Sequence, residues 1–210
     1  MVEPLHILFE DNHVLAVVKP APLLTQAPGH VPSLEAQVKA YLKEKYAKKG
    51  NVYLGIPHRL DRPVSGVIVF ARNTKAARRL AEQFQKRQVQ KLYWALVEGT
   101  PQEAEGQWED WLLKIAGEAR SERATPDTPK AKRASLRFRR LKSFEGGSLL
   151  EMEPETGRMH QLREQAALRG HPAGQPGDDG GSASRHDRWD GRQPRGDRSS
   201  CGCARLHSIA

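Results

Sequence analysis

The chain has 210 residues, a formal net charge of +9 and a pI near 9.8. This length suits one compact domain, and the Lys and Arg excess is spread over several segments, which predicts a polyanionic partner, most simply nucleic acid. No apolar run approaches the roughly 20 residues of a membrane-spanning helix and no signal segment opens the chain, so we expect a soluble, cytoplasmic protein without a membrane role. Cys201 and Cys203 offer neither a disulfide framework nor a four-ligand zinc site.

Two strands are predicted near the start of the chain, over Leu5–Phe9 and Val14–Lys19. Pro20 then ends the strand pairing. From Ser33 onward, apolar residues recur at helical spacing with Lys and Glu between them, which indicates a helix that packs by one face and stops near Gly50.

The middle of the chain alternates between strand and helix patterns. The apolar, β-branched run Val67–Ala71 predicts a buried strand, and Asn73 is placed to cap a helix. That helix carries basic residues away from its apolar side, typical either of an ordinary solvated face or of a face that contacts RNA. Further strands are predicted around Tyr93 and over Trp108–Leu113.

The following segments add more strands than helices. Residues 117–132 are polar and contain Pro and Lys, which predicts a mobile loop. Strands are expected over 134–139, where apolar and polar residues alternate, and over 148–153; a helix is expected over 160–168. Because several strands are joined by short turns, we predict an α+β domain with a mixed, largely antiparallel sheet and packed helices.

One motif stands out chemically. His58–Gly66, with the sequence HRLDRPVSG, places the carboxylate of Asp61 between Arg59 and Arg62 in a turn-rich segment that leads into a predicted buried strand. Taken alone, an Asp between arginines indicates either a structural ion pair or a reactive group held on a rigid frame.

The string HRLDRPVSG resembles the catalytic motif of the RluA-type pseudouridine synthases, which isomerise uridine to pseudouridine within folded RNA. The resemblance continues, in the family's order, over Glu10–Pro20, Lys91–Gly99 and Glu155–Arg163. It covers roughly residues 5 to 172 and implies the pseudouridine synthase catalytic fold for residues 1–172.

Uridine isomerisation needs a carboxylate, either to attack the sugar C1′ or to remove the C2′ proton. Asp61 is the candidate, by resemblance as well as by position. The resemblance implies that Arg163 is its positive partner, that Tyr93 stacks on the flipped uracil, and that Arg59 occupies the vacated space in the RNA. Without the resemblance, the sequence pattern would favour Arg163 as a surface ion-pair residue and Tyr93 as a core tyrosine.

The remaining polar residues of the motifs have supporting roles. Arg62 and Arg158 are expected to bind RNA phosphates or to brace the loop. We discount His58 and His160 as a general base or a metal pair and read them as scaffold residues. No metal or cofactor is expected, since the family's chemistry needs neither. His-Arg-Leu-Asp also resembles the His-Arg-Asp catalytic loop of protein kinases. We reject this interpretation because Leu60 places the Asp one position later than in that loop, and the chain has no Asp-Phe-Gly.

After Pro172 the chain departs from the family pattern. Residues 173–210 are crowded with Gly, Arg, Asp, Ser and Pro and bury too little apolar surface to fold, so they are expected to be disordered or frameshifted. A natural RNA-binding tail is one reading; a shifted reading frame near codon 173 is favoured, because the family-like sequence stops abruptly. The core would then lack its last strands and expose strand edges.

Two functions follow. The first is an RNA pseudouridine synthase acting on ribosomal large-subunit RNA or transfer RNA; the second is a non-catalytic RNA-binding protein, either a degenerate or a truncated synthase. Both require RNA, and neither implies a protein partner, so we expect a monomer. Because no separate RNA-binding domain precedes Leu5, site choice is expected to come from the catalytic domain itself.

Overall fold

The structure of the protein is a computed structural model, which describes residues 4–118, 120–173 and 207–209, with only the backbone described for the last three. The strands are β1 (His6–Glu10), β2 (Val14–Lys19), β3 (Ser65–Ala71), β4 (Leu92–Glu98), β5 (Glu105–Lys114), β6 (Ser121–Ala124), β7 (Lys132–Phe144), β8 (Gly147–Pro154) and β9 (His207–Ile209). The helices in this part of the chain are α1 (Leu34–Lys45), α2 (Thr74–Gln85) and α3 (Gln161–Ala167).

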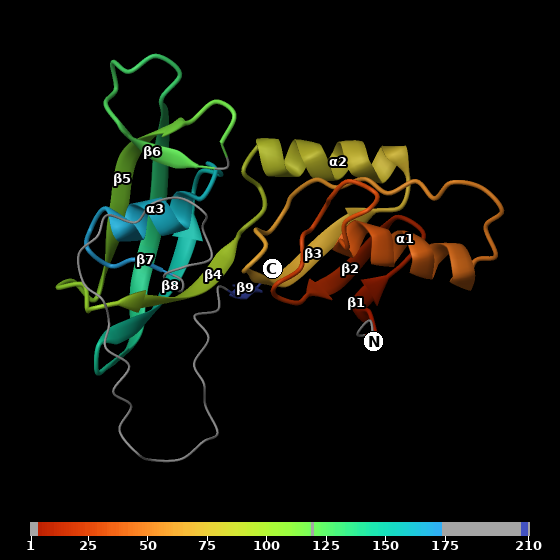
Figure 1. The fold of residues 1–210 in the computed structure, drawn as a ribbon, viewed down its shortest axis with the longest axis horizontal. Coiled ribbons are helices and arrows are strands. Elements are labelled where there is room, and N and C mark those ends of the chain that lie inside the picture. Colours follow the sequence, from red (N-terminus) through yellow and green to blue (C-terminus); the bar gives the residue numbers. More distant parts are fainter. Residues whose placement is uncertain (1–3, 119, 174–206, 210) are drawn as a thin grey trace.

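The strands form one 9-stranded sheet in the order β1-β2-β3-β9-β4-β8-β7-β5-β6. Neighbouring strands pair antiparallel, except that β3 and β9 are parallel. The predicted α+β class with a largely antiparallel sheet is therefore confirmed. Figure 1 shows that the sheet bends into two lobes, with β9 and the start of β4 between them.

The first half of the molecule, residues 4–85, has its own core. Inward-facing residues of β2 and β3 alternate with outward-facing ones, and α1 covers them with one apolar face, as its spacing predicts. The fully or almost fully buried residues of this core include Leu15, Val17, Leu34, Val38, Leu42, Ile68 and Phe70.

The second half, residues 92–173, has a separate core between the sheet and α3. Here β4, β5, β7 and β8 contribute one face each, and Ala166 of α3 packs against them. The rings of Trp108 and Phe138 lie 4.4 Å apart at its centre. Each half thus buries its own apolar surface, and the sheet joins the two through the short strand β9.

The predicted helix cap Asn73 is confirmed, Ser33 caps the first helix as well, and the predicted end of that first helix is wrong. Ser33 accepts a hydrogen bond from the Ala36 amide at 3.3 Å, and Asn73 accepts one from the Ala76 amide at 2.8 Å. The first helix ends at Lys45, earlier than the predicted stop at Gly50. The chain leaves the helical conformation soon afterwards, since Ala47 has a φ of 46°.

The prediction of a loop over residues 117–132 is wrong in part, because β6 forms within it. This strand pairs with β5 in the register Leu113↔Glu122, and it lies at the edge of the sheet. An edge strand is held by main-chain hydrogen bonds and needs few apolar side chains, so its polar sequence does not display the usual strand pattern.

The expectation of a disordered or frameshifted segment over 173–210 falls almost wholly on residues 174–206 and 210, which lie outside the described residues. Ala173 is bridged to Val97, and His207–Ile209 form β9. Because β9 pairs with both β3 and β4, the edges of these two strands are not left open where β9 runs.

Within the described ranges, no helix is long and apolar enough to cross a membrane.

A polar cluster ties α1 to the sheet. Glu10, at the end of β1, is only 10% exposed, and its carboxylate accepts three hydrogen bonds, from Tyr41 at 2.7 Å, Lys45 at 2.8 Å and Tyr46 at 2.6 Å. Arg72 lies 3.2 Å from the same carboxylate. Burial by itself raises the pKa of Glu10, but these hydrogen bonds and the charge of Lys45 lower it to about 2.

We expect Glu10→Gln to lower the free energy of unfolding at pH 7 by about 1–3 kcal/mol, because it removes a buried charged acceptor. The pKa of Glu10 is lower in the folded protein than its ordinary value, so its contribution is present above about pH 4.5 and is lost as the pH falls toward 2. Urea denaturation at pH 7 and pH 3 measures both effects. The exposed Glu145→Gln serves as control, and a destabilisation that is the same at both pH values would contradict the prediction.

Candidate active site

The loop that carries Asp61 is anchored on both sides of the carboxylate. Leu60 and Val64 are 5% and 4% exposed and belong to the first core. Thr25 Oγ1 donates to the Leu60 carbonyl at 2.7 Å and accepts from the Leu60 amide at 3.1 Å. The Asp61 side chain itself is 44% exposed, so a rigid backbone presents an accessible carboxylate.

Lys19 lies fully buried beneath this loop, at the end of β2. Its ammonium donates to the carbonyls of Leu23 at 2.6 Å, Pro20 at 3.2 Å and Arg62 at 3.3 Å. Burial lowers the pKa of Lys19 to about 8, and the negative charge of Asp61 acts in the opposite direction. Lys19 thus ties the turn after β2 to the residue that follows Asp61, and it places a cation below the carboxylate.

The second half contributes His160, whose Nδ1 lies 2.8 Å from Asp61 Oδ2. A carboxylate only accepts hydrogen bonds, so His160 Nδ1 carries the hydrogen when Asp61 is ionised. Burial acts to raise the pKa of Asp61, but the His160 hydrogen bond and the charges of His160, Arg163 and Arg59 bring it below its ordinary value. Asp61 is thereby held as a carboxylate.

The start of α3 is fixed by the buried amide of Gln161. Its oxygen accepts from Thr156 Oγ1 at 2.7 Å and from the Arg158 amide at 3.0 Å. Its nitrogen donates to the Ser135 carbonyl at 3.0 Å and to Gln165 Oε1 at 3.1 Å. These four contacts use both donors and both acceptor sites of the amide, so the orientation of the segment that carries His160 and Arg163 is well defined.

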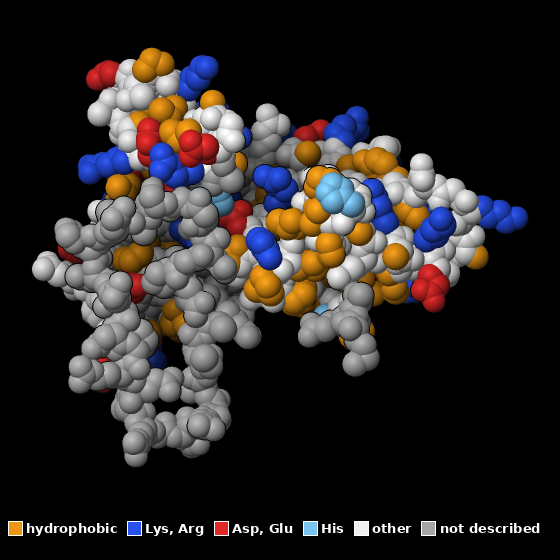
Figure 2. All heavy atoms as spheres, viewed as in Figure 1, with side chains coloured by type: hydrophobic (Ala, Val, Ile, Leu, Met, Phe, Trp, Pro, Cys, Tyr) orange, Lys and Arg blue, Asp and Glu red, His pale blue; other side chains and the backbone are white. Residues whose placement is uncertain are grey.

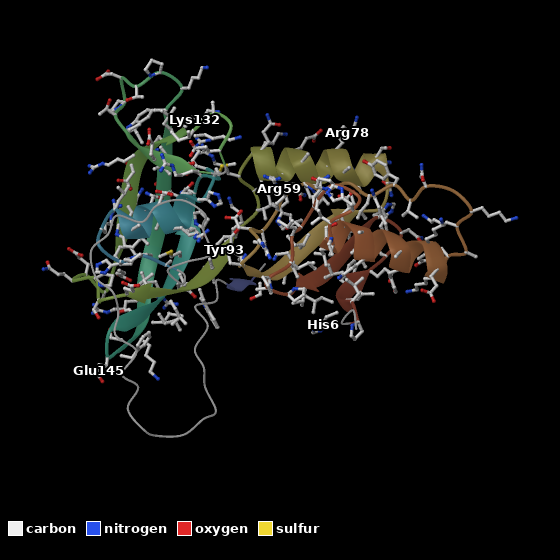
Figure 3. The ribbon with its side chains drawn as sticks, viewed as in Figure 1. His6, Arg59, Arg78, Tyr93, Lys132 and Glu145 are labelled. Atoms are coloured by element: carbon white, nitrogen blue, oxygen red, sulfur yellow. The ribbon has the colours of Figure 1, made fainter. Side chains whose placement is uncertain are left out.

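Tyr93 lies at the start of β4, where the two halves meet. It packs against buried residues of both cores, and its backbone pairs with Met152 of β8 and Ser208 of β9. Figure 3 shows Tyr93 and Arg59 near the centre of the molecule, between the two lobes, whereas Lys132 lies farther out. The predicted stacking tyrosine therefore lies at the junction of the two halves.

The three predicted RNA-binding arginines are arranged differently. Arg59 and Arg62 are exposed on either side of Asp61. Arg158 Nε donates to the Arg133 carbonyl at 3.0 Å, so its guanidinium braces the start of β7. Figure 2 shows Lys and Arg side chains on both halves of the face it presents, several of them near the middle.

His58 is a scaffold residue in the structure. Its Nε2 accepts a hydrogen bond from the Val69 amide at 3.0 Å, and its ring stacks on Phe84 of α2 at 4.7 Å. Burial, together with the nearby charge of Lys91, lowers the pKa of His58 to about 4, so the ring is neutral at pH 7. Among the described residues, no group of three or more His, Cys, Asp and Glu side chains could hold a metal ion.

The structure brings the charges of Arg163 and Arg59 within reach of Asp61 and places Tyr93 where the two cores meet. The catalytic and binding roles of these residues stay predictions. Sequence reasoning missed the contacts of His160 and Lys19 with the Asp61 loop. The available signals were weak: Lys19 is a charged residue that ends an apolar strand, and His160 stands three residues before Arg163. Neither pattern identifies a partner that is distant in sequence.

Comparisons with known proteins agree on one family. The model of the family described as RNA pseudouridylate synthase matches residues 13–168. The tRNA pseudouridine synthase C of Yersinia pestis is 34% identical, over 96% of this chain and 77% of that protein. An uncharacterized RNA pseudouridine synthase of Zymomonas mobilis is 47% identical, over 53% of this chain and 51% of that protein. The chain thus spans about half the length of this last relative.

A solved structure shares the fold. The human protein named RNA Pseudouridylate Synthase Domain Containing 1 aligns with a TM-score of 0.69 and 23% sequence identity, over 100% of this chain and 78% of that one. At this identity the likeness establishes the fold alone.

We expect Lys19→Met to lower the free energy of unfolding by about 2–4 kcal/mol, because three carbonyl groups lose a buried donor that methionine cannot replace. Urea denaturation at pH 7 measures the loss, and the exposed Lys75→Met on α2 is the control. Equal stability of the Lys19 and Lys75 variants would show that the buried ammonium contributes no net stability to the loop.

Proposed function

Because the chain belongs to the RNA pseudouridylate synthase family, we propose that it isomerises specific uridines in RNA to pseudouridine, with Asp61 as the catalytic carboxylate. One observation carries the proposal: within the matched residues 13–168, an accessible carboxylate is held ionised on an anchored loop, between the two halves of the sheet. The alternative, a non-catalytic RNA-binding protein, gives no use to such a carboxylate.

The reaction needs no outside atom. The bond between N1 and C1′ breaks, the uracil turns, and C5 joins C1′; C5 then loses its proton and N1 gains one. Asp61 either attacks C1′ as a nucleophile or removes the C2′ proton to generate a glycal. Both routes require the ionised form, and the lowered pKa of Asp61 supports its presence at neutral pH.

The other residues assist the carboxylate and the base. Arg163 and Arg59 contribute positive charge that favours ionised Asp61. Tyr93 supplies an aromatic face for the detached uracil and a phenolic group near its edge. A base inside folded RNA must first be turned out of its stack, at a cost of a few kcal/mol, and Arg59 is exposed beside Asp61, where it can fill the vacated space.

The substrate is RNA, and the proposal includes both transfer RNA and ribosomal large-subunit RNA. One relative is named for transfer RNA and is similar along 96% of this chain. The net charge of +9 favours a polyanionic substrate of either kind. Arg59 and Arg62 are the proposed phosphate contacts of the Asp61 loop, while Arg158 braces β7.

Tritium release from RNA labelled at uracil C5 tests the reaction, with transfer RNA and ribosomal RNA offered separately. We expect Asp61→Asn to reduce the rate of release by about 10⁴-fold or more, because the reacting group is lost. RNA affinity and its dependence on salt should stay nearly unchanged, because no cation that contacts phosphate is removed.

The exposed Asp127→Asn is the matched control and should release tritium at the wild-type rate. If the wild-type chain binds RNA but releases no tritium from either RNA, the non-catalytic reading is correct. Release that persists in Asp61→Asn would assign the chemistry to another residue.

A further inference from the structure

The contact between Asp61 and His160 crosses between the two separately packed halves. Asp61 belongs to the first half, and His160 belongs to the second. Arg163, which also belongs to the second half, adds positive charge at Asp61. The Asp61 carboxylate is therefore hydrogen-bonded to a residue of the opposite half.

The backbone of His160 is itself unusual. It has a φ of 51° and a ψ of 23°, a left-handed conformation that costs a residue with a side chain about 1–2 kcal/mol. Such conformations persist where the surroundings determine them, and they concentrate at functional sites. Here the next residue, Gln161, is held by four hydrogen bonds, which fixes the turn into α3.

The His160 ring is not used to cap the helix. Although His160 occupies the N-cap position of α3, its side chain makes no capping hydrogen bond. Its Nδ1 is directed to Asp61 Oδ2, and the side chain is 19% exposed, compared with 44% for Asp61.

We propose that His160 is a positioning residue, whose Nδ1–H hydrogen bond holds the Asp61 carboxylate in its reactive orientation across the junction of the two halves. The proposal rests on the proposed isomerase function. Positive charge also acts on Asp61 from Arg59 on its own loop, Lys19 of β2 and Arg163 of α3. The His160 hydrogen bond is directional, so it favours one orientation of the carboxylate.

Two variants separate the ring's hydrogen bond from its backbone conformation. His160→Asn keeps a donor close to the position of Nδ1 and tolerates the left-handed conformation. His160→Gly accepts that conformation at lower cost but has no donor. A residue needed only for the turn would be replaced well by both, whereas a positioning residue would be replaced by Asn alone.

We expect His160→Gly to lower kcat by about 10- to 100-fold with little change in KM, because misplacement of a reacting group affects the chemical step more than RNA binding. His160→Asn should recover most of the loss. The acid limb of the pH profile should move to higher pH in the Gly variant, because loss of the hydrogen bond raises the pKa of Asp61. Lys130→Gly, at another left-handed residue with a φ of 67°, is the control and should match wild type.

A readout without RNA separates this inference from the proposed function. The pKa of the Asp61 carboxyl is measured by ¹³C NMR in the wild-type chain and both variants, with the signal assigned through Asp61→Asn. A higher pKa in the Gly variant, reversed in the Asn variant, supports the contact even if the chain proves inactive on the RNAs offered. Equal pKa values in all three folded proteins, or equal loss of kcat in Gly and Asn, would overturn the proposal.

Discussion

The proposed active site lies where two separately packed halves of one sheet meet, so its geometry depends on how those halves are held together. Each half buries its own apolar residues, and Tyr93 packs against both cores. Because Asp61 and His160 belong to different halves, their 2.8 Å contact depends on how the two halves are packed against each other.

Both halves fix their part of the proposed site in the same way. In each half, a buried polar side chain forms hydrogen bonds next to Asp61 or His160. On one side, Lys19 and Thr25 bind carbonyl groups of the Asp61 loop. On the other side, the Gln161 amide satisfies four partners just after His160. Anchors of this kind cost desolvation, and satisfied hydrogen bonds offset it, so the loops are ordered without burying Asp61.

Sequence patterns were sufficient for most of the fold, and the motif resemblance was sufficient for the family, whereas the roles of the site residues stay predictions. An apolar run between polar turns indicated β2, helical spacing indicated α1, and the cap Asn73 indicated the start of α2. These signals act between neighbouring residues. The strand β6 was missed because an edge strand needs no apolar pattern. The Asp61–His160 contact was missed for a different reason: it joins residues 99 positions apart, and no local signal reports such a pairing.

Under the proposed function, the charge around Asp61 also has to suit a polyanionic substrate. RNA phosphates that approach the loop raise the pKa of a carboxylate, and a binding interface that excludes water strengthens the effect. Such a shift favours the protonated acid, which acts neither as a base nor as a nucleophile. Lys19 below the loop and Arg59 and Arg163 beside it place positive charge that opposes this shift. The lowered pKa of Asp61 in the free protein therefore acts against the change that nearby phosphates cause.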